Sequence, residues 1–318
     1  MSIEVLNIVL GSSCNRKCRY CIRAGGEREF VLRKSEPTRV VRRLQIEAES
    51  GRLKSLRRVQ FFGGEPLLYF DRIKEIRNAL LQMGVRPSQF WRVTTNGDLV
   101  DADYVTWANR SGDVRTVVSW HDGSISDESW SHIFKLWSVS VCALITHSNP
   151  TADWVRPRYS ELVRRYKREL SFSVYPIHAA GHGGCESLAQ DDVMTFVRWV
   201  EECSLRQDAF SRQIAGQALR MATEEPALGG AICSGDTVLT LDALGVEHLC
   251  PHNPTPDTDR KKGLVASARR ECASCEAWSV CRGGCWLSEN RVAECLFQKE
   301  FLKIGRKLSE ATRHRATI

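Results

Sequence analysis

Gly11-Ser-Ser-Cys14-Asn-Arg-Lys-Cys18-Arg-Tyr-Cys21 is the stretch around which the chain is organised. Three residues separate its first two cysteines, and two residues separate the second pair. Three thiolates can hold three of the four irons of a [4Fe–4S] cluster, and no fourth cysteine follows at the distance seen in ferredoxins. The pattern therefore predicts a cluster with one open iron, which is useful only if an exchangeable ligand binds it. A zinc loop or three buried thiols are the alternatives, and the first is disfavoured because zinc prefers four ligands.

Strands and helices alternate outward from this loop. Alternation of this length implies parallel pairing and right-handed crossovers, so the predicted class is α/β. Six such units would make a partial (β/α)6 TIM-type barrel, in which the chemistry lies at the carboxyl ends of the strands. The expected strands are 5–10, 58–62, 90–95, 114–119, 138–146 and 170–177, with helices including 71–83, 191–204 and 207–222.

Polar and glycine-rich segments follow several of these strands. Gly63-Gly64-Glu65 follows the second strand, and its glycines would let the backbone come close to a ligand. Thr95-Asn96-Gly97 follows the third strand, where Asn96 is either part of an ordinary turn or a direct ligand contact. His121 follows the fourth strand; a hydrogen-bonded structural histidine is the favoured interpretation, and a proton carrier is the alternative.

A second group of cysteines lies beyond residue 230. Two short strands, 237–241 and 246–249, are expected to form a hairpin with Gly245 at its turn. A zinc ribbon using four of these cysteines, 272, 275, 281 and 285, is one interpretation of the spacing. The group consists of Cys233, Cys250, Cys272, Cys275, Cys281, Cys285 and Cys295.

Three cysteines lie outside both groups. Cys203 falls on the apolar stripe of helix 191–204 and is expected in the core. Cys142 lies inside the fifth strand, facing either the barrel interior or the helices. Cys185 follows the sixth strand, where a thiol could donate a hydrogen atom or be inert.

Composition limits the class of protein. The 318 residues suffice for one large and one small domain, and 42% are apolar. No run of residues approaches a membrane span, and no charged and then apolar leader opens the chain. The thirteen cysteines cluster with metal-type spacings, so we expect a reducing, cytoplasmic location. The formal charge of +7 includes a basic run over 156–168, for which a solvated helix face is the favoured interpretation and a binding patch the alternative. Because no recognition motif is present, nucleic acid is not the expected partner.

The cysteine loop closely resembles the motif of the radical S-adenosylmethionine (radical SAM) superfamily, and the glycine-rich segments resemble its GGE and TNG motifs. This resemblance implies that Cys14, Cys18 and Cys21 hold three irons of the cluster and that the cofactor's amino and carboxylate groups bind the open fourth iron. It also implies that Glu65 accepts a hydrogen bond from the cofactor's ammonium group. The cofactor-binding residues predicted in this way are Tyr20, Gly63, Gly64, Glu65, Asn96 and Ser119.

The second cysteine group closely resembles the SPASM domain, which carries two auxiliary [4Fe–4S] clusters. We therefore predict a radical SAM core over 1–225 and a SPASM-like domain over 226–318. The resemblance assigns Cys233, Cys250 and Cys285 to the nearer cluster and leaves its fourth ligand open. It assigns the outer cluster to Cys272, Cys275, Cys281 and Cys295.

The resemblance implies an enzyme that cleaves S-adenosylmethionine to a 5′-deoxyadenosyl radical and abstracts a substrate hydrogen. Oxidation, crosslinking or other modification of a peptide or protein is the favoured outcome. An epimerase or dehydrogenase of a sugar or aminocyclitol is the alternative. The candidate catalytic residues are Cys185, which would donate a hydrogen atom in an epimerisation, and His121 as a proton carrier. A pure electron-transfer protein is disfavoured by the open cluster. The expected partners are a reductant such as flavodoxin or ferredoxin and, since little chain precedes Cys14, either a separate leader-peptide-binding protein or a folded protein substrate.

Overall fold

The structure is a computed structural model in which the chain forms two compact units. Unit 1 comprises Met1–Ser119, Ser124–Val139 and Ala231–Gly263, and unit 2 comprises Trp120–Gly123, Ser140–Gly230 and Leu264–Ile318. The residues that the structure describes are 2–18, 20–21, 37–121, 125–176, 186–223, 237–248, 272, 274–277 and 291–316.

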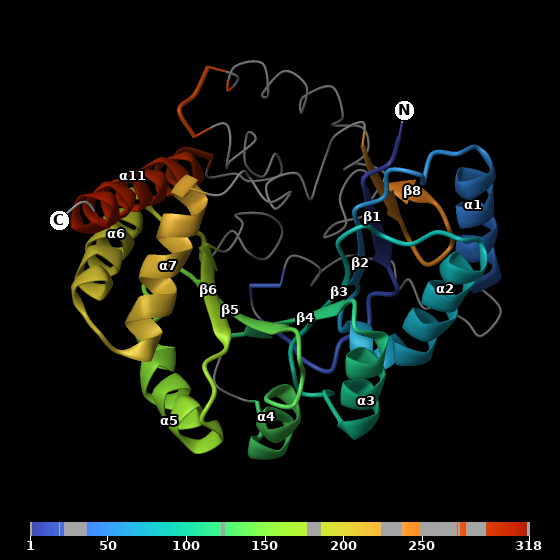
Figure 1. Cartoon of the computed structure of the whole chain (residues 1–318), viewed down its shortest axis with the longest axis horizontal. Helices are drawn as coiled ribbons and strands as arrows, with labels where there is room; N and C mark the ends of the chain where they lie inside the picture. The colour runs from blue at the N-terminus through green and yellow to red at the C-terminus, as the bar shows by residue number, and fades with distance from the viewer. Residues whose placement is uncertain are drawn as a thin grey trace. The chain divides into compact units, whose positions relative to one another are not determined.

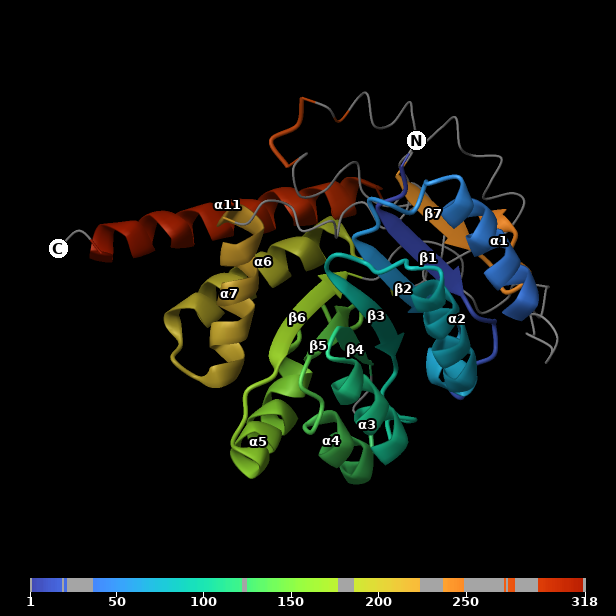
Figure 2. The same cartoon turned by 45° about the vertical axis from the view of Figure 1, so that its right-hand side comes forward.

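Unit 1 is built on a sheet with the strand order β4-β3-β2-β1-β7-β8. Neighbours from β4 to β7 pair in parallel, and β8 pairs antiparallel with β7. Figure 2 shows β7, from late in the chain, lying beside β1. The strands are β1 (Val5–Val9), β2 (Arg58–Phe62), β3 (Phe90–Thr95), β4 (Val114–Trp120), β7 (Val238–Leu241) and β8 (Glu247–His248).

Helices follow the strands of unit 1 and lie along one side of the sheet (Figure 1). Burial of Val40 and Leu44 fixes the inner face of the first helix. Asp101 caps the third helix by accepting a hydrogen bond from the Tyr104 N–H at 2.8 Å, and Gly112 ends it with a left-handed φ of 72°. The helical segments are α1 (Pro37–Glu49), the 3-10 turn η1 (Pro66–Tyr69), α2 (Phe70–Gln82), α3 (Ala102–Ser111) and α4 (Asp127–Ile133).

A row of polar side chains crosses four strands of this sheet. Asn7 stands opposite both Gln60 and Thr240, and Gln60 stands opposite Arg92. Asn7 donates to the Thr240 hydroxyl at 3.2 Å and accepts from the Gln60 amide at 3.0 Å, and Arg92 donates to Gln60 at 3.2 Å. Asn7, Gln60 and Thr240 are buried, so these bonds satisfy groups that burial would otherwise leave unpaired. The row therefore fixes the register of β7 on β1.

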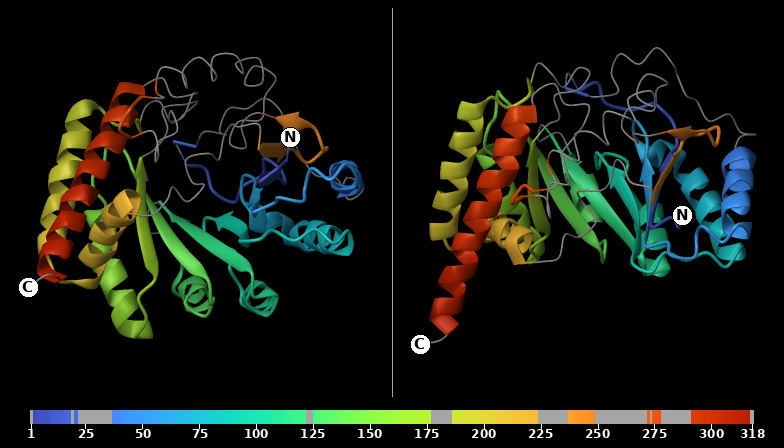
Figure 3. Two further views of the ribbon diagram at one scale, coloured as in Figure 1. Left: turned by 45° about the horizontal axis from the view of Figure 1, so that its top comes forward. Right: turned by 90° about the horizontal axis from the view of Figure 1, so that it is seen from above.

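In its described residues, unit 2 contains two parallel strands and four helices, with a short 3-10 turn, η2 (Asp153–Val155), before the first helix. Phe196 contacts Phe297 and Phe301, with ring centroids 4.9 and 5.4 Å apart, so the last helix packs on the earlier ones (Figure 3). Gly305 permits a close approach, since a Cβ there would lie 2.0 Å from the Ala218 carbonyl oxygen. The other elements are β5 (Val139–Ile145), β6 (Ser171–Pro176), α5 (Arg156–Tyr166), α6 (Gln190–Leu205), α7 (Ala209–Thr223) and α11 (Arg291–Ala316).

Three arginines of the basic run over 156–168 form ion pairs with acids. Arg158 and Arg165 contact Glu161 at 2.6 and 2.7 Å, and Arg156 contacts Asp208 at 3.1 Å. This pairing agrees with the interpretation as a solvated helix face. Among the described helices, none is both long and apolar enough to span a membrane.

The predicted α/β class, with parallel strands separated by helices, is confirmed. The strands expected at 58–62 and 90–95 have those bounds, and the hairpin expected around Gly245 is present, with a φ of 76° at that glycine. The boundary predicted at residue 225 stays a prediction. Beyond it, β7 and β8 continue the sheet that contains β1.

Candidate active site

The cysteine loop directly follows β1. Cys14 is exposed, Cys18 and Cys21 are half-buried, and none of the three is in a disulfide. The Arg16 N–H donates to the Cys14 sulfur at 3.4 Å, which favours the thiolate. Partial loss of solvent around the sulfur nevertheless raises the pKa of Cys14. Metal binding would offset this rise, because a coordinating thiol is deprotonated.

The glycine pair after β2 touches the cysteine loop rather than only flanking it. The Gly64 N–H donates to the Gly11 carbonyl, and the Glu65 N–H donates to the Ser13 carbonyl, both at 2.9 Å. A Cβ on Gly64 would lie 2.2 Å from the Ser13 oxygen, so only glycine permits this approach. At Gly63 the nearest atom to such a Cβ would be 3.2 Å away. The predicted contact of both glycines with the cofactor stays a prediction.

Glu65 joins the end of β2 to the end of β3. Its buried carboxylate accepts hydrogen bonds from the Thr95 hydroxyl at 2.7 Å, the Asn96 N–H at 2.8 Å and the Leu67 N–H at 3.0 Å. Burial raises the pKa of Glu65, and these three donors oppose that rise. A carboxylate has about four acceptor positions, so about one is left for the cofactor ammonium predicted from the resemblance.

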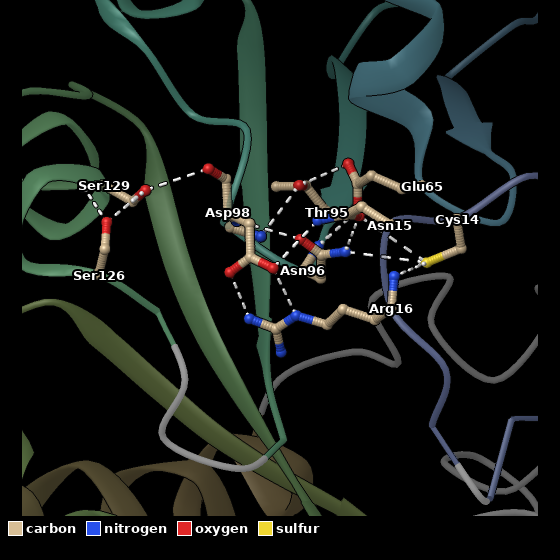
Figure 4. Close-up of polar contacts among 10 residues, drawn as sticks. Cys14, Asn15, Arg16, Glu65, Thr95, Asn96, Asp98, Ser126 and Ser129 are labelled. Atoms are coloured by element: carbon tan, nitrogen blue, oxygen red, sulfur yellow. Dashed lines mark hydrogen bonds and ion pairs between the residues drawn. The ribbon is translucent and has the colours of Figure 1, made fainter.

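Asn96 lies against the cysteine loop, and Figure 4 shows the network around it. Its amide donates to the Asn15 side chain at 2.7 Å and to the Cys14 sulfur at 3.9 Å. Asp98, two residues further on, binds Arg16 of the loop through Nε at 2.7 Å and accepts from the Asn15 amide at 3.1 Å. Asn96 therefore contacts the loop that carries the cysteines, and its predicted contact with the cofactor stays a prediction.

The remaining predicted residues of this region are placed as follows. Tyr20 is half-buried in the cysteine loop, and Ser119 is half-buried near the end of β4. His121 directly follows β4; the structural role favoured for it and the alternative role as a proton carrier both stay predictions. Cys185, the predicted hydrogen donor, lies outside the described residues. Cys203 is buried in α6, which confirms the prediction that it belongs to the core.

The hairpin of β7 and β8 is held by a carboxylate that sequence reasoning missed. Asp242 accepts hydrogen bonds from the N–H groups of Leu244 at 2.8 Å and Val246 at 2.9 Å. Its other oxygen contacts His248 Nε2 at 2.9 Å, and both side chains of this pair are almost fully buried. The sequence signal that could have found Asp242 is its position at the start of a tight turn, because an aspartate there often accepts a hydrogen bond from the backbone two residues further on.

Only part of the second cysteine group can be placed. The Cys275 N–H donates to the Cys272 carbonyl at 2.9 Å, and Cys295 is exposed on α11. Cys233, Cys250, Cys281 and Cys285 lie outside the described residues. Within the described part of the chain, no three His, Cys, Asp or Glu side chains already surround a common point that could hold a metal ion.

A family comparison identifies the first third of the chain. Residues 8–123 match the sequence model of the Radical SAM superfamily. The chain contains a radical SAM domain. The matched residues include the cysteine loop, the Gly63-Gly64-Glu65 segment and Asn96, which is the site described above. The resemblance of this part of the chain to the radical SAM superfamily is thereby confirmed.

Solved structures extend the likeness over nearly the whole chain. One is anSMEcpe with bound AdoMet and the Kp18Cys peptide, at 15% identity and a TM-score of 0.61, covering 97% of this chain and 99% of that chain. Another is Streptococcus suis SuiB bound to S-adenosylmethionine, at 17% identity and a TM-score of 0.54, covering 90% and 73% respectively. At these identities the likeness shows the fold, and it confirms the partial (β/α)6 barrel. Among curated proteins, none matches the chain by sequence.

The residues of the radical SAM domain fit an iron–sulfur cluster. One exposed and two half-buried cysteines of a single loop, Cys14, Cys18 and Cys21, offer the soft sulfur ligands that such a cluster requires. That loop is tied to the carboxyl ends of β2 and β3 by the contacts of Gly64, Glu65 and Asn96. A ligand at the loop would therefore meet side chains from three strand ends, which is where α/β barrels place their chemistry.

Proposed function

We propose that the radical SAM domain binds a [4Fe–4S] cluster through Cys14, Cys18 and Cys21 and cleaves S-adenosylmethionine to abstract a hydrogen atom from a substrate. When bound, the cluster supplies the electron for that cleavage. The docking of the cysteine loop onto Gly64 and Glu65 carries the proposal, since it holds the loop that carries the three thiols against the strand ends. Glu65 would hold the cofactor's ammonium group with its remaining acceptor position, and Tyr20 would pack on the adenine.

The proposed reaction is oxidation, crosslinking or another modification of a peptide or protein. Support comes from two proteins of similar fold: anSMEcpe has been solved with the Kp18Cys peptide, and SuiB with the precursor peptide SuiA. The cysteines beyond residue 230 would hold two auxiliary clusters that accept the electron left on the substrate radical. A reductant such as flavodoxin or ferredoxin would supply the electron for cofactor cleavage. Thirteen cysteines and reduced clusters suit the reducing cytoplasm.

The test compares the wild-type chain with a variant in which Cys14, Cys18 and Cys21 are all replaced by alanine. After anaerobic reconstitution and reduction, the wild type should form 5′-deoxyadenosine and carry about twelve irons, as three four-iron clusters require. The variant should form no 5′-deoxyadenosine but keep about eight irons, because the other cysteines are intact. Persistent 5′-deoxyadenosine from the variant would refute the assignment of the thiols.

The same preparation separates the substrate classes. A peptide substrate should increase 5′-deoxyadenosine formation and lose hydrogen mass, whereas sugars and aminocyclitols should leave the rate unchanged. Four irons and one zinc per chain would instead support a zinc ribbon in place of the auxiliary clusters.

A further inference from the structure

Arg16 lies between the first two cysteines of the loop and is clamped by Asp98 of the turn after β3. Its Nε donates to Asp98 Oδ2 at 2.7 Å, and its Nη2 donates to Oδ1. The Arg16 side chain is only 8% exposed, and that of Asp98 is 26% exposed. A bidentate arginine–carboxylate contact fixes orientation as well as distance, and partial burial limits its screening by salt.

Asp98 connects the cysteine loop to two other elements (Figure 4). Its carboxylate also accepts from the Asn15 amide at 3.1 Å, and its N–H donates to the Asn96 side chain at 3.0 Å. Its carbonyl oxygen accepts from the Ser129 hydroxyl at 3.1 Å, on the helix α4 that Ser126 caps. One residue therefore ties the loop after β1 to the end of β3 and to the start of α4.

We propose that Arg16 and Asp98 form a positioning pair, which holds the cysteine loop in the geometry that binds S-adenosylmethionine and balances the charge beside the cluster. The inference rests on the proposed function, because it assigns a role toward the cluster held by Cys14, Cys18 and Cys21. Neither residue is a metal ligand or a reacting group. They act through Asn15 and Asn96, whose amides link Asp98 to Cys14.

The charges of the pair give the proposal a signature that loss of structure alone would not produce. Reduction adds an electron to the cluster, so nearby positive charge favours the reduced form and nearby negative charge disfavours it. In Asp98→Asn a negative charge beside the cysteine loop is lost while Arg16, two residues from Cys14 and Cys18, keeps its positive charge, so the reduction potential should rise. In Arg16→Gln the charge of Asp98 is left uncompensated, and the potential should fall. A purely structural loosening would shift both variants in one direction.

The chain offers a matched control pair in the same unit. Arg77 on α2 contacts Asp113, which follows α3, at 2.8 Å, and their side chains are 10% and 33% exposed. Asp113→Asn therefore removes a similar charge from a similar setting. It leaves the contacts of the cysteine loop intact, so its thermal midpoint should fall without a change in potential or cofactor affinity.

The experiment uses the reconstituted full-length chain with five forms: wild type, Arg16→Gln, Asp98→Asn, Asp113→Asn, and the reversal Arg16→Asp with Asp98→Arg. Redox titration read by electron paramagnetic resonance gives the potential, and S-adenosylmethionine binding is followed by the change in the same signal. Each single variant of the pair should weaken this binding about tenfold or more, the usual effect of losing a group that orients a metal ligand. The reversal should restore part of the affinity.

Hydrogen exchange of residues 11–18 adds a readout that needs no turnover. The backbone amides of residues 11–18 should exchange faster in Arg16→Gln and in Asp98→Asn than in Asp113→Asn. The positioning role would be overturned if Arg16→Gln and Asp98→Asn kept wild-type hydrogen exchange and cofactor affinity, or if their reduction potentials moved in the same direction. Formation of 5′-deoxyadenosine by the wild type would still uphold the proposed function in that case. A wild-type chain that holds iron but forms no 5′-deoxyadenosine would overturn the proposed function itself.

Discussion

Gly64→Ala should undock the cysteine loop from the end of β2. The new Cβ would lie 2.2 Å from the Ser13 oxygen and 2.3 Å from the Ser12 oxygen, so the loop backbone must move by about 1 Å to reach ordinary contact. That movement strains two hydrogen bonds of 2.9 Å, from Gly64 N–H to Gly11 and from Glu65 N–H to Ser13. Each such bond contributes about 0.5–1.5 kcal/mol net, so docking should weaken by about 1–3 kcal/mol, or roughly 5- to 150-fold.

The assay measures iron content and the dissociation constant for S-adenosylmethionine in reconstituted protein, with thermal unfolding as a check on the fold. Gly63→Ala is the matched control, because the nearest atom to its Cβ would be 3.2 Å away and a shift of a few tenths of an ångström suffices. Gly64→Ala should therefore lose cofactor affinity far more than Gly63→Ala. Equal affinities in the two variants would refute the argument that close backbone approach requires glycine at position 64.

Two further predictions concern unit 2. His147 contacts Asp192 at 2.7 Å, and this hydrogen bond raises the pKa of His147, so the contact should stabilise the chain fully below about pH 6.5 and lose this effect as the pH rises through the raised pKa. The thermal midpoint of the wild type should therefore exceed that of His147→Gln at about pH 6 and equal it at about pH 9. A difference between the two midpoints that widens with pH would contradict this sign. Gly305→Ala should lower the free energy of urea unfolding by about 1–3 kcal/mol, because the new Cβ would lie 2.0 Å from the Ala218 oxygen. The control is Gly216→Ala in α7, which should be neutral or stabilising because its Cβ would meet only the flexible Arg220 side chain at 3.3 Å.

Sequence reasoning located most strands because strong turn signals bound them. The bounds of β2 and β3 were predicted without error, since Gly63-Gly64 and Asn96-Gly97 end these strands. The fifth strand was predicted over 138–146 and is observed as Val139–Ile145. Its ends have no comparable turn residues, so the last paired residue depends on the neighbouring strand and cannot be read from local sequence.

The candidate site was predicted only where residues form a local motif. The three cysteines and the Gly63-Gly64-Glu65 segment are contiguous patterns, so their chemistry could be inferred directly. The Arg16–Asp98 pair joins residues 82 positions apart, and each charge alone is indistinguishable from a solvated one. Only the parallel alignment of β1 and β3 around β2 brings them together. The position of Asp98 two residues after Asn96, at a strand end, was the available signal.

The pairing of β7 with β1 has a consequence for synthesis of the chain. Thr240, which satisfies Asn7 in the polar row, is made 233 residues after it. At about 5–20 residues per second, one edge of β1 therefore waits roughly 10 to 50 s for its partner strand to be translated. During that time β1 presents an open, apolar strand edge of the kind that pairs wrongly with other chains. The emerging chain should depend on chaperones most strongly before residue 241 leaves the ribosome.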